Sequence, residues 1–145
     1  MALRLGLEDR SLEFFVGAAL ALSVGLSATF LGMDRDRAFY PTVMIVIALL
    51  YGLFAVMGGS IQVLGLESIA IVAFLAASIA GFKRSLWLVV AALAAHGVYD
   101  LVHGQLIANP GVPLWWPAFC SAYDVVAAAY LAWLLSRSKV RAAAT

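Results

Sequence analysis

The chain has 145 residues, of which 65% are hydrophobic and only 12% are charged, and its formal net charge is +1. A soluble fold of this length cannot bury so much apolar surface, so the composition predicts a membrane protein whose surface lies in the lipid bilayer. No run of basic residues is long enough to follow a phosphate backbone, and we expect no nucleic-acid partner. The single cysteine, Cys120, excludes an intramolecular disulfide.

Apolar runs of about 20 residues, the length that crosses a bilayer as a helix, occur five times along the chain. In chain order they cover about 14–33, 41–58, 61–82, 85–107 and 114–136. The weakest boundary is Gly59-Ser60, between the second and third runs. The sequence therefore predicts an all-α bundle of five transmembrane helices, one polytopic domain over residues 1–145, located as a multi-pass protein in a cell membrane.

The first run carries Gly17, Ala21 and Gly25 at four-residue spacing, a pattern that lets another helix approach closely in lipid. Residues 1–13 before it are long for the flank of a signal peptide and carry no net positive charge. We therefore expect this run to be retained as a transmembrane helix and to pack tightly against a neighbour.

The distribution of basic residues predicts the orientation. Lys and Arg follow the first, third and fifth runs, at Arg35, Arg37, Lys83, Arg84, Arg137, Lys139 and Arg141. The alternate loops contain neither residue, and the two arginines before the first run, Arg4 and Arg10, are accompanied by acidic residues. Because cytoplasmic loops are enriched in Lys and Arg, we expect the N-terminus outside and the C-terminus in the cytoplasm.

Both histidines of the chain lie in the fourth run, within the stretch His96-Gly97-Val98-Tyr99-Asp100-Leu101-Val102-His103. At about 100° per residue on a helix, Asp100 is rotated about 40° from His96 and His103 about 20° to the other side. The three side chains therefore share one face. Ionisable groups inside a bilayer are costly, which makes this face the candidate functional site.

The fifth run places Cys120 and Asp124 on one stripe of its helix. At a rise of about 1.5 Å per residue, Asp100 lies about 10 Å, Asp124 about 15 Å and His96 about 16 Å below the outer boundary of the bilayer. These three side chains can converge, whereas His103 lies about 10 Å along the axis from His96. The sequence predicts a polar cluster in the outer half of the membrane.

Imidazole and carboxylate ligands suit zinc, iron or manganese, and two ligands one helical turn apart plus one from a neighbouring helix form a partial tetrahedron. We expect His96, Asp100 and Asp124 to bind a divalent transition metal ion. The side chains that could orient these ligands by hydrogen bonds, or replace them, are His103, Glu67, Tyr99 and Cys120. An open fourth position on the metal would allow hydrolysis or modification of a lipid-like substrate, with His103 or Glu67 as candidate catalytic residues that move protons.

Two other functions fit the same residues. Asp, Glu and His side chains inside a bundle also build proton or cation pathways, although only Ser23, Ser27, Thr29 or Ser78 could complete one through the inner half. A hydrogen-bonded pair of His96 with Asp124 could instead stabilise the contact between two helices in a structural subunit or assembly factor. A pair of Asp100 with His103 would do the same. The partners expected are the lipid bilayer, a lipid-like or small-molecule ligand, further copies of the chain, or a larger membrane complex.

Cys120 has no basic neighbour in the sequence that would favour a thiolate, so a packed thiol is the alternative to a metal ligand. The stretch Trp115-Trp116-Pro117-Ala118-Phe119-Cys120-Ser121-Ala122-Tyr123-Asp124, together with residues 96–103, resembles small bacterial integral membrane proteins of uncharacterised function. The resemblance covers the fourth and fifth runs. It implies a location in the bacterial inner membrane and no particular activity.

Overall fold

The computed structural model describes the backbone of residues 2–140 and the side chains of residues 10–140. Five α-helices make up most of this part of the chain: α1 (Ala2–Leu31), α2 (Phe39–Met57), α3 (Ile61–Lys83), α4 (Trp87–Leu106) and α5 (Trp116–Ser136). Each is long and apolar enough to cross a membrane, α1 from Arg10 onward. The predicted all-α fold with five helices of membrane-spanning length is confirmed.

The helix ends differ from the predicted spans most clearly at the start of the chain. The first helix begins at Ala2 rather than at Phe14, because the Leu, Ala, Arg and Glu residues that precede Phe14 are strong helix formers and continue the helix beyond the apolar run. The fifth begins at Trp116 rather than at Leu114, with Pro117 in its first turn, where the missing N–H has no helical partner to lose. Hydropathy thus locates the span, whereas backbone propensity and capping locate the helix ends.

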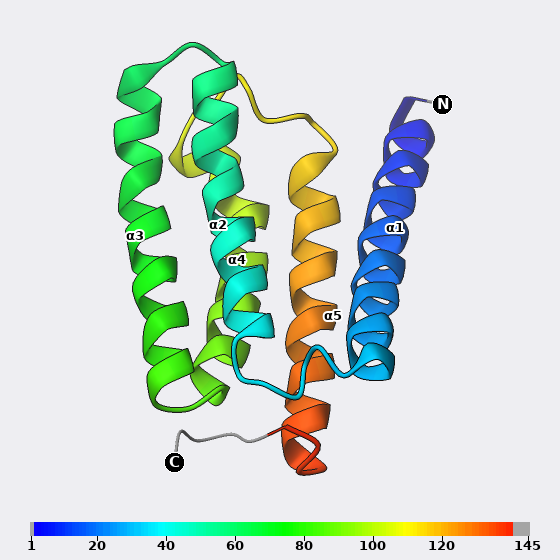
Figure 1. Ribbon diagram of the computed structural model, residues 1–145. Coiled ribbons are helices and arrows are strands. Elements are labelled where there is room, and N and C mark those ends of the chain that lie inside the picture. Colours follow the sequence, from blue (N-terminus) through cyan, green and yellow to red (C-terminus); the bar gives the residue numbers. More distant parts are fainter. Residues whose placement is uncertain (1, 141–145) are drawn as a thin grey trace.

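The break between α2 and α3 is a short turn. Gly59 has a φ of +71°, in the left-handed region that favours glycine. Ser60 then caps α3, since its Oγ accepts a hydrogen bond from the N–H of Val63 at 3.2 Å. The weakest predicted boundary, at Gly59-Ser60, therefore does separate two helices. The turn makes α2 and α3 an antiparallel pair (Figure 1).

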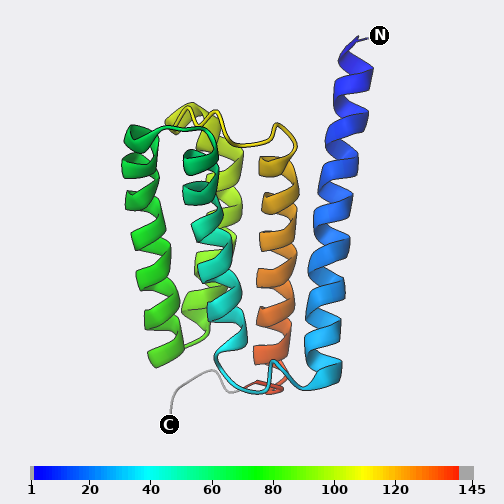
Figure 2. The same cartoon turned by 45° about the horizontal axis from the view of Figure 1, so that its top comes forward.

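The helices pack side by side in the order α1, α5, α4, α3, α2, and α2 also contacts α4. The first helix lies at one edge of the bundle, and its beginning extends past the other helices (Figure 2). It packs on α5 through its small residues: a Cβ at Gly17 would overlap the carbonyl oxygen of Phe119, and a Cβ at Gly25 would lie 2.9 Å from the ring of Tyr130. The expected close contact at the small-residue stripe is confirmed.

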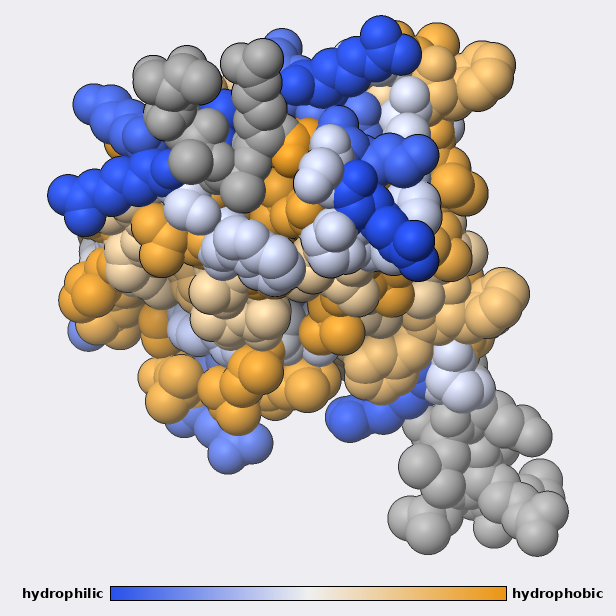
Figure 3. Space-filling view, turned by 90° about the horizontal axis from the view of Figure 1, so that it is seen from below, coloured by the Kyte–Doolittle hydropathy of each residue, from blue (hydrophilic) through white to orange (hydrophobic). Residues whose placement is uncertain are grey.

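The two ends of the bundle differ in charge. The α1–α2 and α3–α4 connections and the end of α5 lie at one end, which we call the inner end after the predicted orientation. Figure 3 views this end and shows hydrophilic side chains gathered there. The opposite end, with the α2–α3 and α4–α5 connections, is the outer end. The orientation across a membrane stays a prediction, and Arg4 and Arg141 lie outside the residues whose side chains are described.

The outward face of the bundle is apolar, as contact with lipid requires. Phe15, Phe30 and Ile69 are 70%, 90% and 72% exposed. The polarity of the interior changes from one end of the bundle to the other. Among its largest fully buried side chains, those toward the inner end are apolar and include Met44, Leu93 and Leu131. Those toward the outer end are mostly polar: Tyr51, Glu67, His96, Asp100, His103 and Asp124.

Candidate functional site

Four buried side chains on α4 and α5 form a compact group, which we call the four-residue cluster. His96 and Asp100 come from α4 and Cys120 and Asp124 from α5, and each offers one potential ligand atom within 4.8 Å of the other three. All four side chains belong to residues at most 2% exposed. The structure therefore brings together the three residues that the sequence grouped and adds Cys120 to them.

Helix α4 approaches α5 closely at Gly97. A Cβ at this position would lie 3.1 Å from the carbonyl oxygen of Ser121 and 3.4 Å from the Cβ of Asp124. His96 and Asp100 are one helical turn apart on α4, and Cys120 and Asp124 are one turn apart on α5. Helical periodicity therefore places each pair on the side of its helix that faces the other helix. The cluster follows from this crossing, because each helix supplies one pair.

The imidazole of His96 lies between the two carboxylates. Its Nδ1 forms a hydrogen bond with Oδ2 of Asp124 at 2.7 Å and lies 3.6 Å from Oδ2 of Asp100. The thiol of Cys120 donates a longer bond to Oδ2 of Asp124, at 3.9 Å. One imidazole, one thiol and two carboxylates are thus held together away from the protein surface.

Each carboxylate of the cluster has an oxygen that accepts no hydrogen bond. These atoms are Oδ2 of Asp100 and Oδ1 of Asp124, and both are enclosed by the protein. A buried acceptor without a partner costs about 1–3 kcal/mol, so such atoms are uncommon and indicate a missing partner such as an ion. The cluster therefore has the ligand types and the unsatisfied acceptors of a cation-binding site.

Tyr51 of α2 connects the cluster to the rest of the bundle. Its hydroxyl donates a hydrogen bond to Oδ1 of Asp100 at 2.7 Å, and its ring stacks on the imidazole of His103 with centroids 4.0 Å apart and planes at 25°. Sequence reasoning missed this residue. One hydroxyl in a mostly apolar helix does not reveal which neighbour it faces.

A second polar group lies closer to the outer end, and we call it the outer network. His103 Nε2 lies 2.8 Å from Oε1 of Glu67, and the hydroxyl of Tyr99 donates to Oε2 at 3.3 Å. The side-chain amide of Asn109, in the α4–α5 loop, donates to Oε1 at 2.8 Å. Glu67 is fully buried, and these three donors compensate its carboxylate.

The structure thus divides the residues that the sequence proposed for the site into two groups. His103, Glu67 and Tyr99 belong to the outer network and are not members of the four-residue cluster, whereas Cys120 is a member. His103 binds Glu67 and not Asp100, so the pair of Asp100 with His103 is absent. Asn109 is the second residue that the sequence did not reveal, because its partner Glu67 is 42 positions away in the chain.

The polar side chains considered for a path through the inner half differ in their hydrogen-bond partners. Ser23 bonds back to the carbonyl of Ala19 in its own helix at 2.7 Å, as expected of serine in a membrane helix. Thr29 binds the hydroxyl of Tyr130 at 2.9 Å and the carboxylate of Asp34. Ser78 is buried and has no hydrogen-bond partner. No hydrogen bond joins the side chains of Ser23, Thr29 and Ser78 to the cluster.

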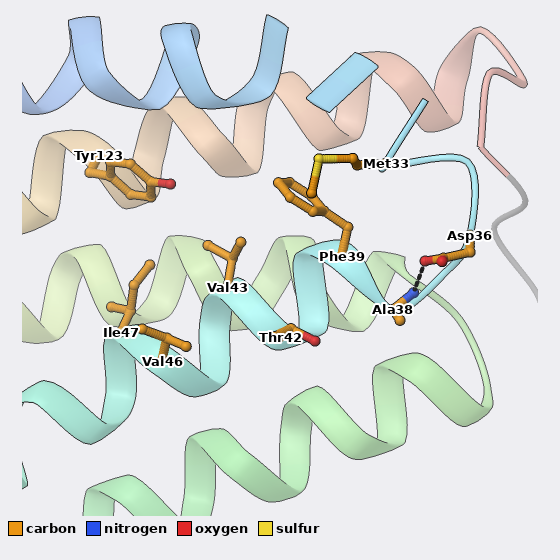
Figure 4. Close-up of a pocket in the computed structure, with 9 residues that line it drawn as sticks. All are labelled: Met33, Asp36, Ala38, Phe39, Thr42, Val43, Val46, Ile47 and Tyr123. Atoms are coloured by element: carbon orange, nitrogen blue, oxygen red, sulfur yellow. Dashed lines mark hydrogen bonds between the residues drawn. The ribbon is translucent and has the colours of Figure 1, made fainter. Parts of the chain in front are cut away.

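A groove of about 510 Å³ opens between α2 and α5 in the inner half of the bundle. Figure 4 shows it between Phe39, Val43 and Ile47 of α2 and Tyr123 of α5. Its walls are almost entirely apolar, and none of the four cluster residues lines it. The groove and the cluster are therefore separate features.

Comparisons with protein families, with curated proteins and with solved structures found no match for this chain. The resemblance to small bacterial membrane proteins accordingly stays a prediction.

Proposed function

We propose that this multi-pass membrane protein binds a divalent transition metal ion, such as zinc, iron or manganese, through His96, Asp100 and Asp124, with Cys120 at the fourth ligand position. The observation that carries the proposal is the pair of enclosed carboxylate oxygens that accept no hydrogen bond, beside an imidazole and a thiol. Nitrogen, sulfur and oxygen donors in this combination suit zinc best among the common divalent ions.

The distances in the cluster support a single ion. Metal–ligand bonds of about 2.0–2.3 Å in a tetrahedron place the ligand atoms roughly 3.3–3.8 Å from one another. The four candidate atoms all lie within 4.8 Å of one another, so small rotations of the side chains close the site. Because both pairs of ligands stand on rigid helices, little backbone movement is needed.

Charge also favours a divalent ion. The cluster contains two aspartates, and α2, α4 and α5 contain no Lys or Arg, while the only basic residue of α3 is Lys83 at its last position. Two ionised carboxylates in an apolar bundle need a compensating positive charge. A divalent cation bound by a neutral imidazole, two aspartates and the Cys120 thiolate leaves a net charge of −1, against −2 for the two carboxylates without the ion.

Hydrolysis or modification of a lipid-like substrate needs an open position on the metal, and Cys120 lies close enough to take that position. The groove in Figure 4 is also lined by none of the four ligands. His103 and Glu67, the candidate catalytic residues, are bound to each other in the outer network.

One observation favours a structural role as the second candidate. The hydrogen bond between His96 and Asp124 already joins α4 to α5 without a metal ion. Polar pairs of this kind contribute about 0.6–2 kcal/mol in membrane bundles and fix the register of two helices. The two functions differ in the metal content of the purified protein.

The deciding experiment is metal analysis of the full chain, purified in detergent without chelators and then dialysed against Zn²⁺. We expect about one ion per chain in the wild type and loss of the ion in Asp100→Asn and Asp124→Asn, because each substitution removes a ligand. Asp36→Asn is the matched control: this aspartate lies in the α1–α2 connection, and its variant should bind normally. Wild-type protein without stoichiometric metal would contradict the proposal, and unfolding of both cluster variants would favour the structural role.

A further inference from the structure

A cation that binds the four-residue cluster must reach it through a buried layer on one side. Toward the inner end, the fully buried side chains in the layer next to the cluster include Met44 of α2, Leu93 of α4 and Leu131 of α5, each 0% exposed. These side chains offer no carboxylate or imidazole to replace the hydration shell of an ion. Access from the outer end is therefore favoured.

Polar groups continue from the cluster toward the outer end. His103 stands on α4 nearly one turn beyond Asp100, and Tyr51 lies between the two, with its hydroxyl on Asp100 and its ring on His103. The His103 imidazole faces the carboxylate of Glu67, which is 0% exposed although it carries a titratable group. Buried carboxylate and imidazole side chains along one route are typical of ion pathways in membrane bundles.

Asn109 covers this route where it reaches the outer end. Its Nδ2 donates to the backbone carbonyl of Tyr51 at 3.2 Å and to Glu67 at 2.8 Å, and its Oδ1 accepts from the N–H of Gly111 at 3.1 Å. Gly111 lies directly against the carbonyl oxygen of Phe54, where a Cβ would overlap. The loop thus contains no helix of its own and is held over Glu67 by the contacts of Asn109 and Gly111 with α2 and α3.

We propose that Glu67 and His103 form a second, transient binding site through which the metal ion passes between the outer end and the four-residue cluster, and that Asn109 is the latch over this site. The inference rests on the proposed metal binding. The carboxylate and imidazole of the transient site match the donors of the cluster, so the ion exchanges one ligand set for another of the same kind. Release of Asn109 exposes the carboxylate of Glu67, whose negative charge attracts the cation.

The test measures the rate of Zn²⁺ binding to the detergent-purified full chain after rapid mixing with Zn²⁺ alone. Glu67→Gln preserves the shape of the side chain and removes its charge. We expect binding about tenfold slower, since a site whose charge is opposite to that of the ion accelerates association by about that order. Asn109→Ala removes the latch and should accelerate both binding and release. Gln105→Ala, an exposed amide near the outer end of α4, is the matched control and should keep wild-type rates.

The outcomes separate this inference from metal binding itself. Full stoichiometry with wild-type rates in both Glu67→Gln and Asn109→Ala overturns the transient site and leaves the cluster intact. A wild type that binds no Zn²⁺ overturns both proposals. If Glu67→Gln does not fold, the wild type decides: in vesicles of known protein orientation, a membrane-impermeant chelator should remove the ion from the outer end, and removal from the inner end alone overturns the route.

Discussion

Replacing Tyr51 with phenylalanine removes one hydroxyl group and leaves the aromatic ring in place. The hydroxyl donates a 2.7 Å hydrogen bond to Oδ1 of Asp100, while the ring stacks on His103 at a centroid distance of 4.0 Å. The variant therefore isolates the bond that orients one proposed metal ligand. Because the residue is only 2% exposed, water does not replace the lost donor.

The expected magnitude follows from the kind of bond that is lost. A hydrogen bond to a charged acceptor contributes about 1.5–3 kcal/mol. Part of this energy is lost in the metal-free protein as well, where Asp100 also accepts the bond, so only the remainder appears in metal affinity. We expect Tyr51→Phe to weaken Zn²⁺ binding about tenfold, which corresponds to about 1.4 kcal/mol and lies within the range known for groups that orient metal ligands.

The assay is a competition titration with a chelator of known affinity, on detergent-purified protein. Tyr123→Phe is the matched control, because the hydroxyl of Tyr123 lies in the groove of Figure 4 and forms no hydrogen bond with the four ligands. Its affinity for Zn²⁺ should equal that of the wild type. An affinity of Tyr51→Phe within twofold of the control would refute the reasoning that Asp100 is a ligand oriented by Tyr51.

Three further predictions concern packing, the outer network and topology. Gly17→Ala should lower the thermal unfolding midpoint in detergent, since overpacking against Phe119 costs about 1–3 kcal/mol, whereas Gly65→Ala, with open space at its Cβ, should leave the midpoint unchanged or raise it. His103→Ala should destabilise the fold by about 3–5 kcal/mol, because it leaves Glu67 buried without its imidazole partner, and His103→Gln should recover part of the loss. A reporter fused to the C-terminus should be active only in the cytoplasm, and activity on the other side would contradict the predicted orientation.

Local sequence patterns were sufficient for the helices and for each of the two residue pairs that make up the cluster. The Gly58–Ser60 break separates α2 from α3 because glycine with positive φ and a serine cap end one helix and begin the next. His96 and Asp100 share a face because they are one helical turn apart, and the same holds for Cys120 and Asp124. Relations of this kind depend on residues four positions apart and need no knowledge of packing.

The sequence by itself determined the five helices of membrane-spanning length and the presence of ionisable side chains at compatible heights along them. Only the tertiary structure decided that Cys120 joins the cluster, that His103 binds Glu67 and not Asp100, and that Tyr51 and Asn109 connect the two groups. The physical reason is that the bundle is expected to be surrounded by lipid and not by water. A helix in lipid is apolar on every side, so its hydropathy pattern does not reveal its rotation about its own axis. That rotation is set by close contacts such as Gly97 on α5, and it decides which distant side chains meet.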